Sequence, residues 1–187
     1  MKKLRRSLSA DEKRKMSRLV CENLFASGLL GGSLPGSELS ASGSGGAKNI
    51  CVYMDAFGEV ETGEIINRLA ADGKRIFVPC VDGDDIFISP LTKTLERGAF
   101  GIREPQQKDR FDKTKIDVFL IPALAFDRSG SRVGFGRGYY DKLLCGTNSL
   151  KIGLIYSFQL TEEIRAEKHD IKADYIITES TVINCGV

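Results

Sequence analysis

Short apolar runs and segments with apolar residues at helical spacing follow one another along the chain. From Ser9, the pattern S-A-D-E-K places a capping serine before two acidic residues, and apolar residues at helical spacing come next. We expect this helix to run to about Leu30. The apolar run from Asn49 to Met54 is typical of a buried strand. Thr62 then caps a predicted helix with one apolar face, which ends at Gly73.

The second half of the chain continues the same alternation. Further strands are predicted at residues 75–81, 85–89, 116–122, 151–156 and 175–178, and short helices from Gly138 and from Thr161. Strands that alternate with helices indicate an α/β fold. We expect a three-layer α/β/α sandwich with a largely parallel sheet.

Residues 31–48 interrupt this pattern. They contain six glycines and five serines and show no apolar periodicity. We interpret them as a flexible surface insertion, because the chain on either side fits one fold; a linker between two domains is the alternative. A chain of 187 residues with 42% hydrophobic residues has the usual size of one domain. We therefore predict a single domain over residues 1–187.

Charge and cysteine content limit the classes of function. The 27 basic and 25 acidic residues give a formal net charge of +2, too even a balance to suggest binding to nucleic acid or to a membrane surface. The basic N-terminus lacks the apolar core of a secretory signal, and no apolar run is long enough to span a membrane. Five cysteines without a C-x-x-C pair do not form a disulfide framework. We expect a cytoplasmic, monomeric protein whose partners are small molecules.

A glycine-rich segment, R-V-G-F-G-R-G-Y-Y-D at residues 132–141, follows the predicted strand 116–122. In open α/β sheets, ligands bind beyond the carboxyl ends of the strands. Glycines at Gly134, Gly136 and Gly138 allow backbone N–H groups to approach an anion, and the following helix adds the partial positive charge of its N-terminus. This arrangement predicts a phosphate site, with triphosphate as the natural ligand.

The residues around the glycines separate a binding site from a simple turn. The spacing G-x-G-x-G fits neither the dinucleotide fingerprint nor a Walker loop, and on its own it could be a tight strand-to-helix turn. Arg132 and Arg137 can bind phosphate oxygens, however, and Asp141 can bind the Mg²⁺ that accompanies ATP. Tyr139 and Tyr140 add two large amphipathic rings. Core packing alone would not require this combination.

A longer segment resembles a known family. Residues 121–141, I-P-A-L-A-F-D-x-x-G-x-R-V-G-F-G-R-G-Y-Y-D, resemble the signature of 5-formyltetrahydrofolate cyclo-ligases. Residues 59–62 (E-V-E-T), 101–105 (G-I-R-E-P) and 167–170 (E-K-H-D) are similar to other motifs of that family, and the resemblance covers residues 49–179. It implies a fold akin to the sugar-phosphate isomerase and coenzyme A transferase group.

The resemblance also implies a reaction. Members convert 5-formyltetrahydrofolate and ATP to 5,10-methenyltetrahydrofolate, ADP and phosphate with Mg²⁺, through an N5-iminium phosphate. Two alternatives remain open at this point. The chain could be a non-catalytic folate or nucleotide binding module, or a sugar-phosphate isomerase on a related fold, the latter by analogy of fold alone.

Site residues follow from the resemblance position by position. The residues implied to contact ATP are Arg132, Val133, Gly134, Phe135, Gly136, Arg137, Gly138, Tyr139 and Tyr140. Those implied to contact the folate are Met54, Glu59, Phe135, Gly136, Arg137, Gly138 and Tyr139. Arg137 and Tyr140 are expected to act in catalysis, and Asp141 and Asp170 to bind Mg²⁺.

Simpler roles compete with some of these assignments. Glu59 could be an acidic residue near a helix N-terminus, Met54 could fill the core, and Asp170 could stabilise a turn. His169 is the single histidine of the chain, which excludes a multi-histidine zinc site, and we expect it to be structural.

The N-terminus departs from the family pattern. Members begin with a [KR]-x-x-[IL]-R helix about a dozen residues before the serine cap, and its basic residues bind ATP phosphates. Lys2 and Arg6 lie too close to Ser9 for that register, so we expect this helix to be missing. Either the natural chain starts upstream, or Lys2, Lys3, Arg5 and Arg6 replace these contacts.

Overall fold

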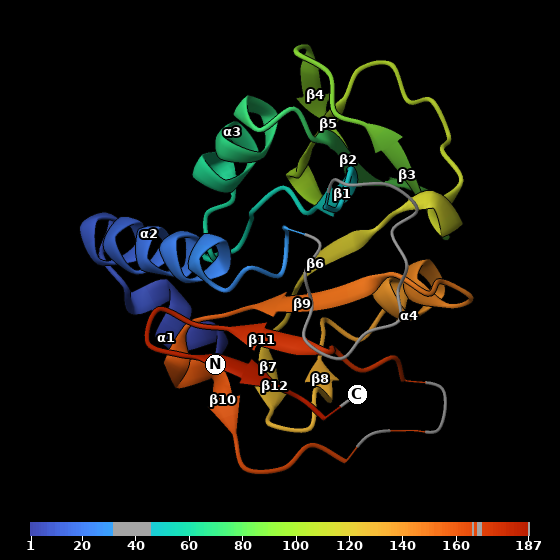
Figure 1. Cartoon of the computed structure of the whole chain (residues 1–187). Helices are drawn as coiled ribbons and strands as arrows, with labels where there is room; N and C mark the ends of the chain where they lie inside the picture. The colour runs from blue at the N-terminus through green and yellow to red at the C-terminus, as the bar shows by residue number, and fades with distance from the viewer. Residues whose placement is uncertain (32–45, 166, 168–169, 187) are drawn as a thin grey trace.

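A computed structural model describes residues 1–31, 46–165, 167 and 170–186, and its centre is a twisted, mostly parallel sheet (Figure 1). The strands lie in the order β12 (Val182–Asn184), β11 (Tyr175–Ile177), β9 (Leu150–Leu154), β6 (Val118–Pro122), β1 (Asn49–Val52), β2 (Arg75–Asp82) and β3 (Asp85–Pro90). All neighbours from β11 to β2 pair in parallel, and the outer pairs β12–β11 and β2–β3 are antiparallel. The predicted α/β fold with a largely parallel sheet is confirmed.

Helices cover both faces of this sheet. Helices α2 (Ala10–Ala26) and α3 (Gly63–Ala71) lie side by side over one face, and α4 (Tyr139–Leu144) packs on the other (Figure 1). Strand β6 shows why: Val118 and Leu120 belong to the apolar cluster under α2 and α3, whereas Phe119 and Ile121 belong to the cluster under α4. Successive side chains of a strand point to opposite faces, so an all-apolar strand requires cover on both sides.

Shorter elements complete the described chain. They are α1 (Lys2–Ser7), β4 (Leu95–Arg97), β5 (Arg103–Pro105), β7 (Ala125–Asp127), β8 (Arg132–Val133), β10 (Leu160–Thr161) and the 3₁₀ turns Ala99–Gly101, Lys113–Lys115 and Ser157–Gln159. β10, β7 and β8 form a small sheet, and β4 pairs with β5.

Helix α2 begins as predicted. The Ser9 hydroxyl accepts a hydrogen bond from the Glu12 N–H at 3.2 Å, and the Glu12 carboxylate accepts one from the Ser9 N–H at 2.8 Å. This capping box satisfies two backbone donors of the first turn. The helix ends at Ala26, before the predicted Leu30, and Gly28 follows in the left-handed region at φ +74°.

The cap of α3 differs from the prediction. Thr62 does precede the helix, but its side chain makes no capping hydrogen bond. The Thr62 hydroxyl instead donates to the carbonyl of Tyr53 at 2.8 Å. This bond joins the start of α3 to the end of β1, so the residue stabilises the connection rather than the helix terminus.

Two predictions of local structure are wrong, and they concern the extent of α2 and the chain after Thr161. At the N-terminus, the short helix α1 lies directly before the Ser9 cap, which is not the register of the family's helix. The short helix expected from Thr161 is absent from the described residues, because Leu160 and Thr161 pair with β7 as strand β10. The Ile164 N–H then donates to the Asp127 carboxylate at 2.8 Å, which fixes the chain in an extended course. Strand β12 was not predicted, and residues 32–45 of the insertion lie outside the described part.

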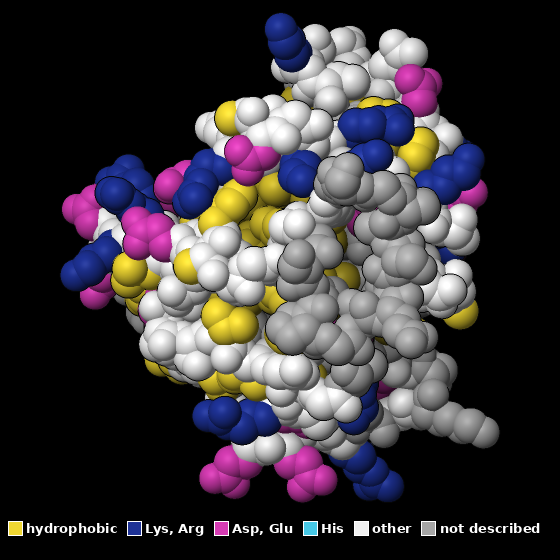
Figure 2. Space-filling model, in the orientation of Figure 1, with side chains coloured by type: hydrophobic (Ala, Val, Ile, Leu, Met, Phe, Trp, Pro, Cys, Tyr) yellow, Lys and Arg dark blue, Asp and Glu magenta, His cyan; other side chains and the backbone are white. Residues whose placement is uncertain are grey.

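The mixed surface charges and the free cysteines agree with the balanced charge and the cysteine spacing of the sequence. The face in Figure 2 carries basic and acidic side chains interspersed around its periphery, with hydrophobic side chains toward the centre. All five cysteines are free, and Cys21, Cys51 and Cys80 are buried. Within the described ranges, no helix combines the length and apolar character that crossing a membrane requires.

Candidate active site

A pocket of about 840 Å³ opens where β1 and β6 end. Its walls come from α1, from the loop after β1, from residues 99–104, from the glycine-rich segment and from residues 164–170. All the candidate residues of the sequence analysis line it: Met54, Glu59, Arg132, Val133, Gly134, Phe135, Gly136, Arg137, Gly138, Tyr139, Tyr140, Asp141 and Asp170. The fold therefore brings together groups that are far apart in the sequence.

The glycine-rich segment crosses the pocket between two regular elements. Arg132 and Val133 form β8, and Tyr139 begins α4, so the loop proper is short. Gly136 and Gly138 have φ of +85° and +63°, which other L-residues adopt rarely, and a Cβ at either would meet no atom within 4 Å. Backbone conformation, rather than lack of space, requires glycine there. Because α4 has only six residues, the groups of this segment that are best suited to contact an anion are the arginines and the loop N–H groups.

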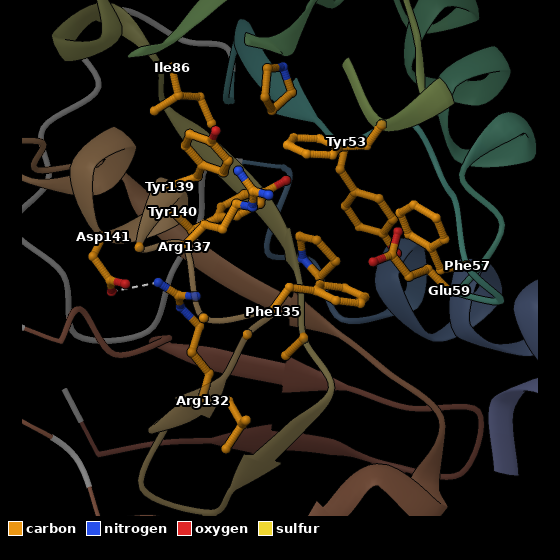
Figure 3. Close-up of a pocket in the computed structure, with 18 of the residues that line it drawn as sticks. Tyr53, Phe57, Glu59, Ile86, Arg132, Phe135, Arg137, Tyr139, Tyr140 and Asp141 are labelled. Atoms are coloured by element: carbon orange, nitrogen blue, oxygen red, sulfur yellow. Dashed lines mark hydrogen bonds and ion pairs between the residues drawn. The ribbon is translucent and has the colours of Figure 1, made fainter. Parts of the chain in front are cut away.

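Arg132 and Asp141 form a partly buried ion pair at one side of the pocket (Figure 3). The Arg132 Nη2 lies 2.5 Å from the Asp141 Oδ1, and the two side chains are 6% and 22% exposed. The same Asp141 oxygen accepts a hydrogen bond from the Ile171 N–H at 3.2 Å. Arg132 Nε is buried without a hydrogen-bond partner among the described residues. The ion pair thus leaves one donor of the Arg132 guanidinium without a protein partner in the described part of the chain.

Tyr139 and Tyr140 follow directly at the start of α4. The Tyr139 hydroxyl donates to the Gly83 carbonyl at 3.3 Å, which ties α4 to the turn between β2 and β3. The Tyr140 ring lies 5.7 Å from the Arg132 guanidinium carbon. Burial raises the pKa of Tyr140 well above its ordinary value, so this phenol is a hydrogen-bond donor at neutral pH.

Glu59 lies on the opposite side of the pocket, beside Tyr53 and Phe57 (Figure 3). The residue is 8% exposed, and burial raises the pKa of its carboxyl from 4.5 to about 7. A hydrogen bond from the Ala56 N–H at 3.1 Å and the charge of Arg5 act in the other direction. A carboxyl that titrates near neutral pH in a pocket is typical of a functional group.

Phe57 and Phe100 are among the pocket residues that the sequence analysis did not identify. Each is 48% exposed, and they have φ of +52° and +59°, positive values found at no other non-glycine residue of the described chain. Phe57 lies 5.6 Å from the Phe135 ring and Phe100 lies 6.1 Å from the Tyr139 ring, measured between ring centroids. Strained backbone of this kind concentrates at functional sites.

A sequence signal for these residues exists in retrospect. Phe57, Phe100 and Phe135 each directly precede a glycine in an expected loop. All three glycines, at positions 58, 101 and 136, have positive φ. The Phe-Gly pair places an aromatic ring at a sharp change of chain direction, and in this fold all three rings reach the same pocket.

Helix α1 also reaches the pocket. Lys2, Arg5 and Arg6 line it, and the Lys2 Nζ lies 4.8 Å from the centroid of the Phe135 ring. Basic side chains of α1 thus form part of the pocket wall.

Asp170 enters the pocket from the segment before β11. Its carboxylate accepts a hydrogen bond from the Glu167 N–H at 2.8 Å, and the neighbouring Ile171 N–H donates to Asp141. The segments that carry Asp141 and Asp170 thus meet at the pocket. Among the residues that the structure describes, no group of three or more His, Cys, Asp or Glu side chains could hold a metal ion. His169 lies outside the described residues.

Comparisons with known proteins show the family of this chain. The model of the 5-formyltetrahydrofolate cyclo-ligase family matches residues 38–179. A probable 5-formyltetrahydrofolate cyclo-ligase of Schizosaccharomyces pombe is 30% identical over 157 residues, which cover 73% of this chain and 77% of the relative. The 5-formyltetrahydrofolate cyclo-ligase of Escherichia coli is 30% identical over 146 residues, 73% of this chain and 80% of the relative.

Solved structures give the same result over almost the whole chain. The NMR structure of Aquifex aeolicus 5,10-methenyltetrahydrofolate synthetase superposes with a TM-score of 0.79 at 33% identity and covers 100% of this chain and 89% of that one. A 5,10-methenyltetrahydrofolate synthetase from Mycoplasma pneumoniae superposes with a TM-score of 0.72 at 27% identity, covering 95% and 93%.

Proposed function

Because the chain belongs to the 5-formyltetrahydrofolate cyclo-ligase family, we propose that this pocket is its active site. The protein is a ligase that uses ATP to cyclise 5-formyltetrahydrofolate to 5,10-methenyltetrahydrofolate. One observation carries the assignment of the site. Segments from α1 to the chain before β11 meet at a single pocket, and the residues implied for ATP, folate and Mg²⁺ all line it.

The substrate explains why ATP is needed. A formamide carbonyl is a poor electrophile, and its oxygen is a poor leaving group. In the proposed sequence the formyl oxygen attacks the γ-phosphorus of ATP as the bond to ADP breaks, which gives an N5-iminium phosphate. N10 then attacks the formyl carbon and loses its proton, and phosphate leaves as the ring closes. The protein must therefore align phosphate and formyl oxygen and stabilise negative charge on the transferring group.

The glycine-rich segment is suited to the phosphate end of this reaction. Arg132 and Arg137 can donate charge-assisted hydrogen bonds to phosphate oxygens, and the loop N–H groups add further donors. We propose Arg137 and Tyr140 as the groups nearest the transferring phosphoryl. The backbone from Val133 to Gly138 would contact both ATP and the formyl end. The side chains of Phe135 and Tyr139 would pack against the substrates.

The opposite side of the pocket is suited to the folate. We propose that the Glu59 carboxylate accepts hydrogen bonds from N–H donors of the pterin ring, since it is buried and fixed by the Ala56 N–H. Met54, half-buried at the end of β1, would pack on the ring. Glu59 lies on the wall opposite Arg132 and Asp141 (Figure 3).

The carboxylates fit Mg²⁺ in its usual form with ATP. Mg²⁺ is commonly bound by one or two carboxylates together with substrate phosphates and water. Asp141 and Asp170 provide such a pair, and the contact from the Ile171 N–H to Asp141 brings their segments together. When bound, the ion would neutralise charge on the phosphates.

We further propose that residues 1–187 form one cytoplasmic, monomeric domain that acts on small molecules and not on nucleic acid. The order of the sheet and its two covered faces are consistent with a fold akin to the sugar-phosphate isomerase and coenzyme A transferase group.

The direct test of the function is a spectroscopic assay. The protein is mixed with 5-formyltetrahydrofolate, ATP and Mg²⁺, and the near-ultraviolet absorbance of methenyltetrahydrofolate is followed, with ADP measured in parallel. We expect one ADP for each methenyl product and no product when ATP is omitted. Folate and ATP binding by a well-folded sample without ADP release would instead indicate a non-catalytic binding module.

A further inference from the structure

Arg5 is the buried residue of an otherwise exposed helix. Its neighbours Lys2, Lys3, Leu4 and Arg6 are exposed, whereas Arg5 is only 2% exposed. A guanidinium stays charged at any physiological pH, and burying it is costly unless it is paired or hydrogen-bonded. The partners of Arg5 therefore indicate what this position does.

Those partners are backbone carbonyls from two other segments. Arg5 Nη1 donates to the carbonyl of Ala123, just after β6, at 3.2 Å, and Nη2 donates to the carbonyl of Phe57 at 3.0 Å. The Ala123 carbonyl also accepts a hydrogen bond from the buried Gln159 amide at 2.9 Å. One end of the Arg5 bridge is thus fixed to the interior of the fold.

The other end is a loop whose shape depends on that bridge. Phe57 has φ of +52°, a conformation that costs a non-glycine residue about 1 kcal/mol or more. The next residue, Gly58, has φ of +78°, and a Cβ there would lie 3.2 Å from the Arg5 carbonyl oxygen. The loop therefore lies against the backbone of α1 while its Phe57 carbonyl is bound by the Arg5 side chain.

Glu59 belongs to the same loop. Its carboxylate accepts from the Ala56 N–H, so both ends of the turn around Phe57 are hydrogen-bonded. The charged or titratable groups that act on this carboxyl are the Arg5 guanidinium and the Asp55 carboxylate. It also faces the phenols of Tyr53 and Tyr140. Among the residues named here as acting on the Glu59 carboxyl, Arg5 is the one with a positive charge.

We propose that Arg5 is a positioning residue for the folate side of the pocket: by joining Phe57 to Ala123 it holds the loop 55–59 so that the Glu59 carboxylate faces the substrate. This deepens the proposed function and rests on it. It gives Arg5 a different part from Lys2 and Arg6, which line the pocket from the same helix with exposed side chains available to phosphate.

Arg5→Gln and Lys2→Gln form a matched pair that separates the two roles. Each removes one positive charge from α1, and the KM for 5-formyltetrahydrofolate and for ATP is measured for both. Arg5→Gln is expected to raise the folate KM about tenfold or more, the loss of a charge-assisted bridge, with a smaller effect on the ATP KM. Lys2→Gln is expected to show the reverse. A rise in the ATP KM alone for Arg5→Gln would overturn the proposal.

The pH dependence of folate affinity gives a second readout that a general loss of stability would not produce. The charge of Arg5 lowers the pKa of Glu59, so in Arg5→Gln the affinity should reach its plateau at a higher pH than in the wild type. Arg5→Lys keeps the charge but not the guanidinium group whose two nitrogens bridge the carbonyls of Phe57 and Ala123. It should raise the folate KM with little movement of the pH profile. If Arg5→Gln leaves the profile where it is, the inference is wrong.

The coupling between Arg5 and Glu59 can also be tested without measuring enzymatic activity. The pH dependence of the unfolding midpoint is compared for wild type and Arg5→Gln, and again with Glu59→Gln present in both. We expect the range over which stability falls to extend to higher pH in Arg5→Gln, and this difference to vanish with Glu59→Gln. Equal curves in the first comparison would refute the coupling, even if the wild type showed no cyclisation.

Discussion

Arg132 and Asp141 pair with each other, although one is proposed to bind phosphate and the other Mg²⁺. Their 2.5 Å contact joins the start of β8 to the first turn of α4 across the glycine-rich loop. The pair keeps two partly buried, opposite charges compensated and fixes the loop between them. When the magnesium complex of ATP binds, Arg132 would contact a phosphate and Asp141 would contact Mg²⁺. The ion pair could therefore open without leaving either charge unpaired.

Asp141→Asn should impair catalysis more than folding. The change removes the charge that pairs with Arg132 and one proposed Mg²⁺ ligand while keeping the shape. We expect kcat/KM to fall by about a hundredfold or more and the dependence on Mg²⁺ concentration to move to higher concentration. The absorbance assay at varied Mg²⁺ measures both. Asp11→Asn, an exposed acid of α2, is the control and should keep wild-type activity. An unchanged Mg²⁺ dependence in Asp141→Asn would remove this residue from the metal site.

Arg137→Ala should lower kcat about 10²- to 10³-fold, because it removes a positive charge next to the transferring phosphoryl. Its guanidinium carbon lies 4.9 Å from the Phe100 ring on the pocket wall and makes no ion pair among those found in the described chain. Little stability should therefore be lost. Steady-state kinetics with a thermal melt checks both points, with Arg128→Ala on an exposed turn as the control. A variant with wild-type kcat would show that Arg137 is not part of the reaction.

Glu59→Gln should make the stability of the protein less dependent on pH. The folded-state pKa is about 7 against an ordinary 4.5, so the folded protein retains a proton that the unfolded chain releases. Stability in the wild type should then fall as pH rises from about 4.5 to about 7 and stay level above, with a total loss of about 3 kcal/mol. Glu59→Gln lacks this titration, so its free energy of unfolding should rise relative to that of the wild type as pH increases over that interval. Urea unfolding at pH 4.5 and at pH 8 measures the gain.

The matched control for that measurement is Glu22→Gln, which removes an exposed carboxylate of α2. A gain of equal size in both variants would mean that the effect comes from overall charge rather than from burial of Glu59.

Gly130→Ala should be strongly destabilising. Gly130 has φ of +82°, and a Cβ would lie 2.1 Å from the carbonyl oxygen of Ala173, which also hydrogen-bonds to this turn through its N–H at 2.9 Å. The clash separates the β7–β8 hairpin from the segment that carries Asp170, so activity should be lost together with stability. Gly146→Ala, at φ +74° with no atom within 4 Å, isolates the backbone strain and should cost only about 1 kcal/mol. Chemical denaturation of the two variants should therefore differ by several kcal/mol. Similar values would mean that the hairpin moves easily.

Much of the architecture could be predicted because its causes are local. The capping box at Ser9, the all-apolar strand at 118–122 and the glycine that begins α4 each depend on a few adjacent residues. The course of the chain after Thr161 could not be predicted in this way. Its strand depends on pairing with β7 and on the Asp127 carboxylate, 37 residues from Ile164. Strand β12 likewise exists because β11 offers it an edge.

The site shows the same division. The sequence alone predicted that the glycine-rich segment from Arg132 to Asp141 carries hydrogen-bond donors suited to phosphate, because glycine conformation and arginine charge are properties of the residues themselves. It also predicted that Glu59 follows the first strand. Only the tertiary structure decided that Arg5 is buried, since its carbonyl partners at Phe57 and Ala123 are 52 and 118 residues away. Burial and pairing at such separations depend on how the sheet brings the strand ends together, and no local pattern records that.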